Sequence, residues 1–195
     1  NDCFHADFSD LVSLAPSDRG AGLILVQVAA FICRWRAVGG MIDATQPWTQ
    51  VVESARRHLA PHCDSTGRGA ADIALMTLRI FESRLLAQDG ARQEADQLLG
   101  ILLDELGDAL TRDGDTRALS WVTAQALEES ARRSWRNGDG VSARESVLNA
   151  AAILARDDIH DLVLRANVHY TYGRIASTFS RERYRIAIAA LRASE

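Results

Sequence analysis

Lysine is absent from this sequence, and all 22 of its basic residues are arginines. These 195 residues therefore contain neither a P-loop phosphate lysine nor a Schiff-base lysine, which excludes two kinds of enzyme chemistry from them. A basic surplus is absent too, because 26 acidic residues give a net charge of −4. Proteins that bind the phosphate backbone normally carry such a surplus, so we expect this chain to contact no nucleic acid.

Cysteine is scarce, and its placement indicates no disulfide framework. Cys3, Cys33 and Cys63 include no closely spaced pair, which fits reduced thiols in the cytoplasm. The most apolar run, Ala21–Cys33, is too short to span a bilayer and contains Gln27, so it predicts a buried core helix. No signal peptide is visible. We therefore expect a cytoplasmic chain without membrane contact.

Proline and glycine are few, with 3 and 13 copies, which permits long helices. Apolar residues recur at helical spacing, and no alternating strand pattern is seen. The predicted helices cover Phe4–Leu14, Gly22–Val38, Trp48–Leu59, Ala70–Gln88, Arg92–Leu110, Arg117–Arg136, Val141–Arg156, Ile159–Thr178 and Arg181–Ala193. Because Gly22–Val38 is apolar almost all round, we expect it to be central to its neighbours. The predicted fold is all-α, one domain over 1–195 with N-terminal helices in 1–66 and helical hairpins in 67–195.

The stretch Leu127–Arg156 has the clearest organisation, with two helices joined by the turn Gly138-Asp139. Ala131 on the first helix and Ala143 on the second are small residues where two helices would pack closely. This spacing resembles the tetratricopeptide-like helical repeats, in the long-helix variety of the sensor arms of bacterial transcription activators. An unrelated bundle of helical hairpins is the alternative interpretation, since such turns and alanine contacts are common in helical proteins.

The resemblance extends less clearly over roughly Ala70–Leu191. Gly90 and Ala95 repeat the turn and the small residue one unit earlier, at a spacing longer than the roughly 34 residues usual for the family. Tyr172-Gly173 matches the start of a third unit. The resemblance implies antiparallel hairpins stacked as a short α-solenoid with a concave face free for a partner. It thus implies a protein-protein interaction or sensor module of a regulatory protein rather than an enzyme, with no cofactor.

If the groove of such repeats carries over, one groove-facing position falls on Arg84, Arg132 and Arg174. Arg136 lies one turn after Arg132, and Tyr170 one turn before Arg174. Guanidinium groups bind carboxylates and phosphates bidentately, so this set predicts an acidic peptide or another anionic partner. The alternative is that arginine, as the basic residue used throughout, simply covers solvated helix faces.

Two other function classes have some support in the sequence. One is a compact helical domain that binds a small ligand between its helices. The other is a magnesium-dependent diphosphate-processing enzyme, because Asp157, Asp158 and Asp161 spell DDxxD, a pattern of prenyl and terpene synthases. No second acidic motif follows it, and no lysine is present to hold diphosphate. A helix start, capped by Asp157 and Asp158, explains these aspartates better.

A zinc set is the remaining metal hypothesis, drawn from Cys3, His5, His58, His62 and Cys63. Pro61 breaks the helix between the two later histidines, so ordinary histidines at a helix end explain the motif better. No catalytic residues and no metal ligands are therefore predicted.

Both ends of the chain bear on its assembly. Phe4–Val12 and Arg181–Leu191 are terminal apolar edges, and either could mediate a homodimer, since end repeats without a polar cap seek a neighbour. Because the chain begins at Asn1 rather than at a methionine, we expect it to be a fragment of a larger regulatory protein.

Overall fold

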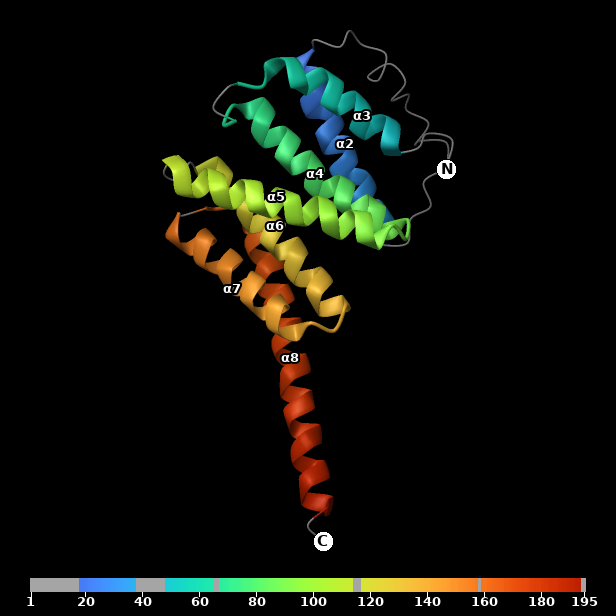
Figure 1. Cartoon of the computed structure of the whole chain (residues 1–195), viewed down its shortest axis with the longest axis vertical. Helices are drawn as coiled ribbons and strands as arrows, with labels where there is room; N and C mark the ends of the chain where they lie inside the picture. The colour runs from blue at the N-terminus through green and yellow to red at the C-terminus, as the bar shows by residue number, and fades with distance from the viewer. Residues whose placement is uncertain (1–17, 38–47, 65–66, 114–116, 158, 194–195) are drawn as a thin grey trace. The chain divides into compact units, whose positions relative to one another are not determined.

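The computed structural model describes residues 18–37, 48–64, 67–113, 117–157 and 159–193. Within these ranges the chain is helical and has no β-strand, so the predicted all-α fold is confirmed (Figure 1). The elements are α2 (Arg19–Ala37), α3 (Trp48–Leu59), the 3-10 turn η2 (Ala60–His62), α4 (Ala70–Gln88), α5 (Arg92–Asp113), α6 (Arg117–Arg136), α7 (Gly140–Arg156) and α8 (Leu162–Ala193).

The chain divides into two compact units, residues 1–105 and 106–195. Each is considered by itself below. The division expected between residues 66 and 67 falls inside unit 1, where α4 packs with α2 and α3. The predicted segment Phe4–Leu14 lies outside the described residues.

One helix prediction is wrong at the C-terminal end. Instead of breaking at Ser180, the chain continues as the single helix α8 (Figure 1). The hydroxyl of Ser180 donates to the carbonyl of Ala176, and that of Thr178 donates to the carbonyl of Arg174. Because these hydroxyls bond back to their own helix, they do not cap a new one. The side chains of Tyr184, Ile188 and Leu191, predicted to face inward, lie outside the described residues.

The start of α8 also differs from the prediction. The carboxylate of Asp161 accepts the backbone N–H of Leu164 at 2.9 Å, so Asp161 caps this helix, whereas Asp157 ends α7. The other oxygen of Asp161 accepts the indole N–H of Trp121 at 2.8 Å. Asp161 therefore both starts α8 and ties its first turn to α6.

Unit 1 is built around a close contact between α2 and α3. A side chain on Gly22 would place its Cβ 2.8 Å from the Cγ of Leu59, so only glycine permits this approach. The apolar stripes predicted for α3 and α4 are buried here, including Val52, Leu78 and Leu85. Large side chains from three helices thus interlock in one core.

Helix α2 packs against both α3 and α4, and these two pack less extensively against each other, so α2 has the central place expected of it among the described helices of unit 1. Leu25, Val26 and Ala29 enter the core, while Ile24 and Phe31 are exposed. By length and composition, α2 is the described helix that could cross a membrane. This is weak evidence, since 44% of its apolar window is buried in the protein and core helices pass the same test.

Unit 2 contains the predicted α6–α7 hairpin. Gly138 adopts a positive φ of 84°, and the carboxylate of Asp139 accepts the N–H of Ser142 at 3.0 Å to cap α7. Ala131 and Ala143 are both fully buried, as the spacing predicted. Helix α8 packs against both α6 and α7, and Phe179 fills the space that a side chain on Gly140 would need.

The turn glycine provides a direct test of the hairpin. Nothing lies within 4 Å of a Cβ on Gly138, so Gly138→Ala should destabilise the protein through its positive φ alone, by about 1–2 kcal/mol. Gly173→Ala is the control, because that glycine lies in the interior of α8 and also has open space around it. It should stabilise the protein by about 0.5–1 kcal/mol in urea unfolding. Equal effects of the two variants would contradict the assigned turn.

The end of α4 provides a test in unit 1. The carboxylate of Asp89 accepts hydrogen bonds from Arg36 of α2 and from the indole of Trp48 of α3. Burial raises the pKa of Asp89, but these two hydrogen bonds outweigh it and lower the pKa below its ordinary value. A lowered carboxyl pKa contributes stability above the unfolded value of about 3.9, and that stability is lost as the pH falls through the folded pKa.

Asp89→Asn should therefore lower the free energy of unfolding at pH 7. The difference from the parent should shrink as the pH falls from about 4 towards the lower folded pKa, because protonation of the unfolded chain then removes the advantage of the charged carboxylate in the folded protein. Chemical unfolding followed between pH 3 and 7 measures this. A difference that stays constant over the whole range would show that the carboxylate charge plays no part.

Candidate functional site

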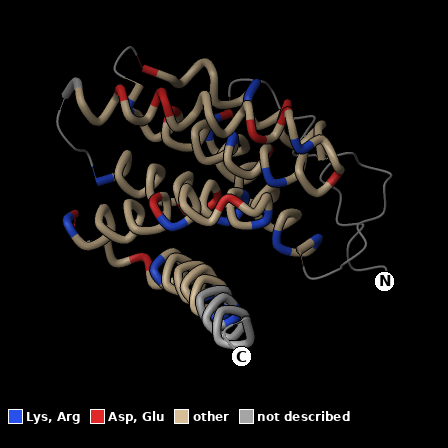
Figure 2. Tube along the Cα trace, turned by 60° about the horizontal axis from the view of Figure 1, so that its bottom comes forward, with Lys and Arg blue, Asp and Glu red and all other residues tan. Residues whose placement is uncertain are grey.

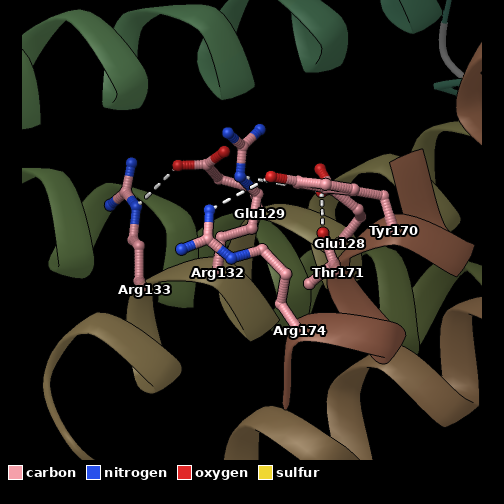
Figure 3. A network of polar contacts seen from close by, with 7 residues as sticks. All are labelled: Glu128, Glu129, Arg132, Arg133, Tyr170, Thr171 and Arg174. Carbon is pink, nitrogen blue, oxygen red and sulfur yellow. Dashed lines mark hydrogen bonds and ion pairs between the residues drawn. The ribbon is translucent and has the colours of Figure 1, made fainter. Parts of the chain in front are cut away.

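The α6–α8 cluster is the candidate site, and its side chains come from two helices of unit 2 (Figure 3). It comprises Glu128, Glu129, Arg132, Arg133 and Trp135 of α6 with Tyr170, Thr171, Arg174 and Thr178 of α8. Acidic and basic residues are interspersed along the described helices (Figure 2), so the case for a site rests on local contacts rather than on a surface of one sign.

A buried carboxylate lies at the base of the cluster. Glu128 is only 1% exposed, and its Oε1 accepts the hydroxyl proton of Thr171 at 2.9 Å. The Nε of Arg132 lies 3.8 Å from the same oxygen. A buried carboxylate without partners would be strongly destabilising. The contact with Thr171 therefore stabilises the orientation in which α6 and α8 face each other, and the contact with Arg132 positions the guanidinium of that residue.

The next pair along α6 is structural. Arg133 and Glu129 are both buried, and the Nε of Arg133 donates to Oε1 of Glu129 at 3.0 Å. Because this guanidinium is desolvated and already engaged, Arg133 is not available to a partner. Neighbouring arginines on one helix therefore have different roles.

Arg174 is the exposed arginine that the cluster holds most firmly. Its guanidinium lies 4.6 Å from the ring centroid of Trp135 and 5.7 Å from that of Tyr170. One of its N–H groups donates to the Tyr170 hydroxyl at 3.1 Å. The Trp135 ring is itself held, because its indole N–H donates to the hydroxyl of Thr178 at 3.4 Å. Cation–π contacts of this kind position a guanidinium while leaving its charge accessible.

The structure brings together three of the five predicted binding residues. Arg132, Tyr170 and Arg174 lie in one network, as Figure 3 shows. Arg136 follows Arg132 by one turn and is exposed at the end of α6. Arg84 belongs to unit 1, where its guanidinium lies 5.9 Å from the Phe81 ring centroid, so its place in the same groove stays a prediction.

Sequence reasoning missed Glu128 and Thr171, the residues that anchor the cluster. A signal was present, since Glu128 and Glu129 precede Arg132 and Arg133 by four residues each. That spacing puts each glutamate beside an arginine on the helix surface. Which of the two pairs becomes buried depends on the packing of α8, which the spacing within α6 does not encode.

The DDxxD motif has other contacts in the structure. Asp157 accepts two hydrogen bonds from the guanidinium of Arg156, at 2.7 and 2.9 Å. Asp161 is occupied with the cap of α8 and with Trp121. Asp158 lies outside the described residues. The two described aspartates thus have structural contacts of their own.

The histidine and cysteine set is also dispersed. His58 is buried in α3 and its Nδ1 has no hydrogen-bond partner, whereas His62 and Cys63 are exposed. Partial desolvation of the thiol, and next the neighbouring Asp72, raise the pKa of Cys63 above its ordinary value, so the thiol stays protonated at neutral pH. Cys3 and His5 lie outside the described residues. Among the residues that the structure describes, no group of three metal-binding side chains occurs.

Thr171→Val tests the anchoring role of Glu128. The change keeps the shape of the side chain but removes the donor to a buried carboxylate, so we expect a loss of about 1–3 kcal/mol in the free energy of unfolding. Ser177→Ala is the control, because that exposed hydroxyl bonds only to a carbonyl of its own helix, and it should change stability by less than about 0.5 kcal/mol. Equal stabilities in thermal unfolding would argue against the buried network.

No family model, no curated protein and no solved structure matches this chain. The functional argument therefore rests on the geometry of the α6–α8 cluster.

Proposed function

We propose that the chain is a protein-protein interaction or sensor module, and that its α6–α8 cluster binds an acidic segment of a partner protein. The observation that carries the proposal is the exposed guanidinium of Arg174, stacked on Trp135 and bonded to Tyr170. Within the described part of the chain, no carboxylate lies at ion-pair distance from Arg174. Such a guanidinium is prepared for an anion that another molecule supplies.

The chemistry favours a carboxylate as that anion. A guanidinium has five N–H donors in its plane, and stacking on an aromatic ring occupies the face rather than the edge. The N–H groups of Arg174 not bonded to Tyr170 therefore remain for a carboxylate, which accepts two parallel hydrogen bonds. Because the side chain is already held, a partner would find it with less loss of conformational entropy than a freely rotating arginine.

Neighbouring charges support the same partner. The cluster and Arg136 together contain four arginines and two glutamates, which leaves an excess of positive charge. Glu128 neutralises part of the charge of Arg132, whereas Arg136 is exposed at the end of the same helix. Aspartates or glutamates spaced along a peptide would be attracted to Arg174 first and to Arg132 and Arg136 next.

The packing of unit 2 supports a repeat-like setting. Helices α6 and α7 form a hairpin through buried Ala131 and Ala143, and α8 packs on both helices. The first helix of a following unit does the same in tetratricopeptide-like solenoids, where successive first helices line the concave face. In that arrangement α6 and α8 would supply the binding face, and a cytoplasmic regulatory protein of bacterial type would be its context.

Binding of a fluorescein-labelled octaglutamate peptide tests the proposal. Arg174→Ala removes the charge-assisted hydrogen bonds and should weaken binding about tenfold, measured by fluorescence anisotropy at low salt. Arg132→Ala should also weaken binding, whereas the exposed Arg144→Ala on α7 is the matched control and should bind as the parent does.

Two outcomes would contradict this function. One is equal affinity of the parent and Arg174→Ala for the peptide, and the other is an equal loss in Arg144→Ala. Octalysine should not compete, since the proposed site is cationic. Thermal unfolding of each variant shows whether a loss of binding comes from a loss of fold.

A further inference from the structure

The hydroxyl of Tyr170 has a hydrogen-bonding capacity that the contacts within the chain leave unused. Its oxygen accepts an N–H group of Arg174 at 3.1 Å, as Figure 3 shows. A phenol also has one O–H donor of its own. In the described part of the chain this donor has no acceptor at hydrogen-bond distance, and Tyr170 is 63% exposed. The proton therefore remains available to a group that another molecule supplies.

We propose that Tyr170 and Arg174 bind the same carboxylate of the acidic partner, with the phenol O–H donating to one oxygen and the guanidinium to the other. This role rests on the proposed function of the α6–α8 cluster and deepens it, because it makes Tyr170 a specificity-determining residue in direct contact with the partner. The carboxylate would then be recognised by a neutral donor and a charged donor together.

The placement of the two side chains suits one shared carboxylate. Tyr170 and Arg174 are four residues apart on α8, so they lie one turn apart on the same side of the helix. The phenol oxygen and the nearer guanidinium nitrogen are 3.1 Å apart. Donors this close can be bound by the two oxygens of a single carboxylate, which is able to accept two parallel hydrogen bonds.

Existing contacts also prepare the phenol for this role. The guanidinium of Arg174 lies 5.7 Å from the ring centroid of Tyr170 and 4.6 Å from that of Trp135, so the three groups restrict one another's movement. Because the Tyr170 oxygen accepts a hydrogen bond from a cation, its O–H bond is polarised and becomes a stronger donor. Residues 162–181 of α8 include no aspartate or glutamate, so no carboxylate of that stretch competes for the proton. A partner carboxylate would thus meet two oriented donors at a small cost in conformational entropy.

Tyr172 provides a matched comparison on the same helix. It is also exposed, at 41%, but it follows Tyr170 by two residues and therefore lies on another side of α8. Tyr170→Phe and Tyr172→Phe each remove a single hydroxyl and keep the aromatic ring. Since phenylalanine and tyrosine have similar helix propensities, the two variants differ mainly in which hydroxyl is lost.

Anisotropy of the fluorescein-labelled octaglutamate peptide at low salt measures the contribution of each hydroxyl. Tyr170→Phe should weaken binding about three- to tenfold, because one hydrogen bond to the peptide is lost, whereas Tyr172→Phe should bind as the parent does. Replacing Tyr170 with O-methyltyrosine distinguishes donation to the partner from support of Arg174. The ether oxygen still accepts from Arg174 but has no proton to donate, so this protein should bind as weakly as Tyr170→Phe. Replacing Tyr170 with p-aminophenylalanine keeps a donor and should restore most of the affinity.

Two results would overturn this role of Tyr170. One is parental affinity of the O-methyltyrosine protein, since the hydroxyl would then act only through Arg174. The other is equal or tighter binding by Tyr170→Phe, which would mean that the hydroxyl occupies an N–H group of Arg174 that the partner could use. In both cases Arg174→Ala would still bind the peptide more weakly than the parent, and the function proposed for the cluster would stand. Failure of that function is a different result, in which Arg174→Ala and the parent bind equally.

Discussion

The close approach of α6 and α7 is the constraint on which unit 2 depends. It requires small side chains at Ala131 and Ala143 and a reversal at Gly138, whose positive φ suits glycine. Once the two helices lie this close, their common surface receives α8, and Gly140 leaves room there for Phe179. The hairpin is thus the platform that decides where the side chains of α8 meet those of α6.

Polar contacts then determine how α8 lies on that platform. Asp161, which caps α8, accepts a hydrogen bond from the indole of Trp121. Further along, the hydroxyl of Thr171 donates to the buried carboxylate of Glu128, and the hydroxyl of Thr178 accepts a hydrogen bond from the indole of Trp135. These contacts follow one another along α8, so they fix its rotation as well as its position. Arg174 lies between the last two, and its stacking on Trp135 follows from that rotation.

Much of the fold could be predicted from the sequence, because helical spacing and turn glycines are local signals. Helices α3, α4 and α6 have the predicted bounds, and the buried alanines of the hairpin are where the spacing indicated. The continuous α8 was missed because hydroxyls such as that of Ser180 suit either a cap or a helix interior, and only the backbone decides. The exposed face of α2 was missed because composition does not show which face of an apolar helix is covered.

The candidate site was only partly predictable for a related reason. The positions of Arg132, Tyr170 and Arg174 on their helix faces follow from the register along each helix. The burial of Glu128 depends instead on contacts between helices. Sequence spacing likewise does not distinguish Arg133, engaged with buried Glu129, from the more exposed Arg132. Contacts between helices therefore separate the candidate binding residues from structural ones.

The central claim is that Trp135 prepares Arg174 to bind a carboxylate. The most direct measurement is a double-mutant cycle on octaglutamate affinity with Trp135→Leu, Arg174→Ala and both together. If Trp135 acts through Arg174, adding Trp135→Leu to Arg174→Ala will cause no further loss of affinity. Independent, additive losses would show that the ring does not act through the guanidinium and would contradict the account.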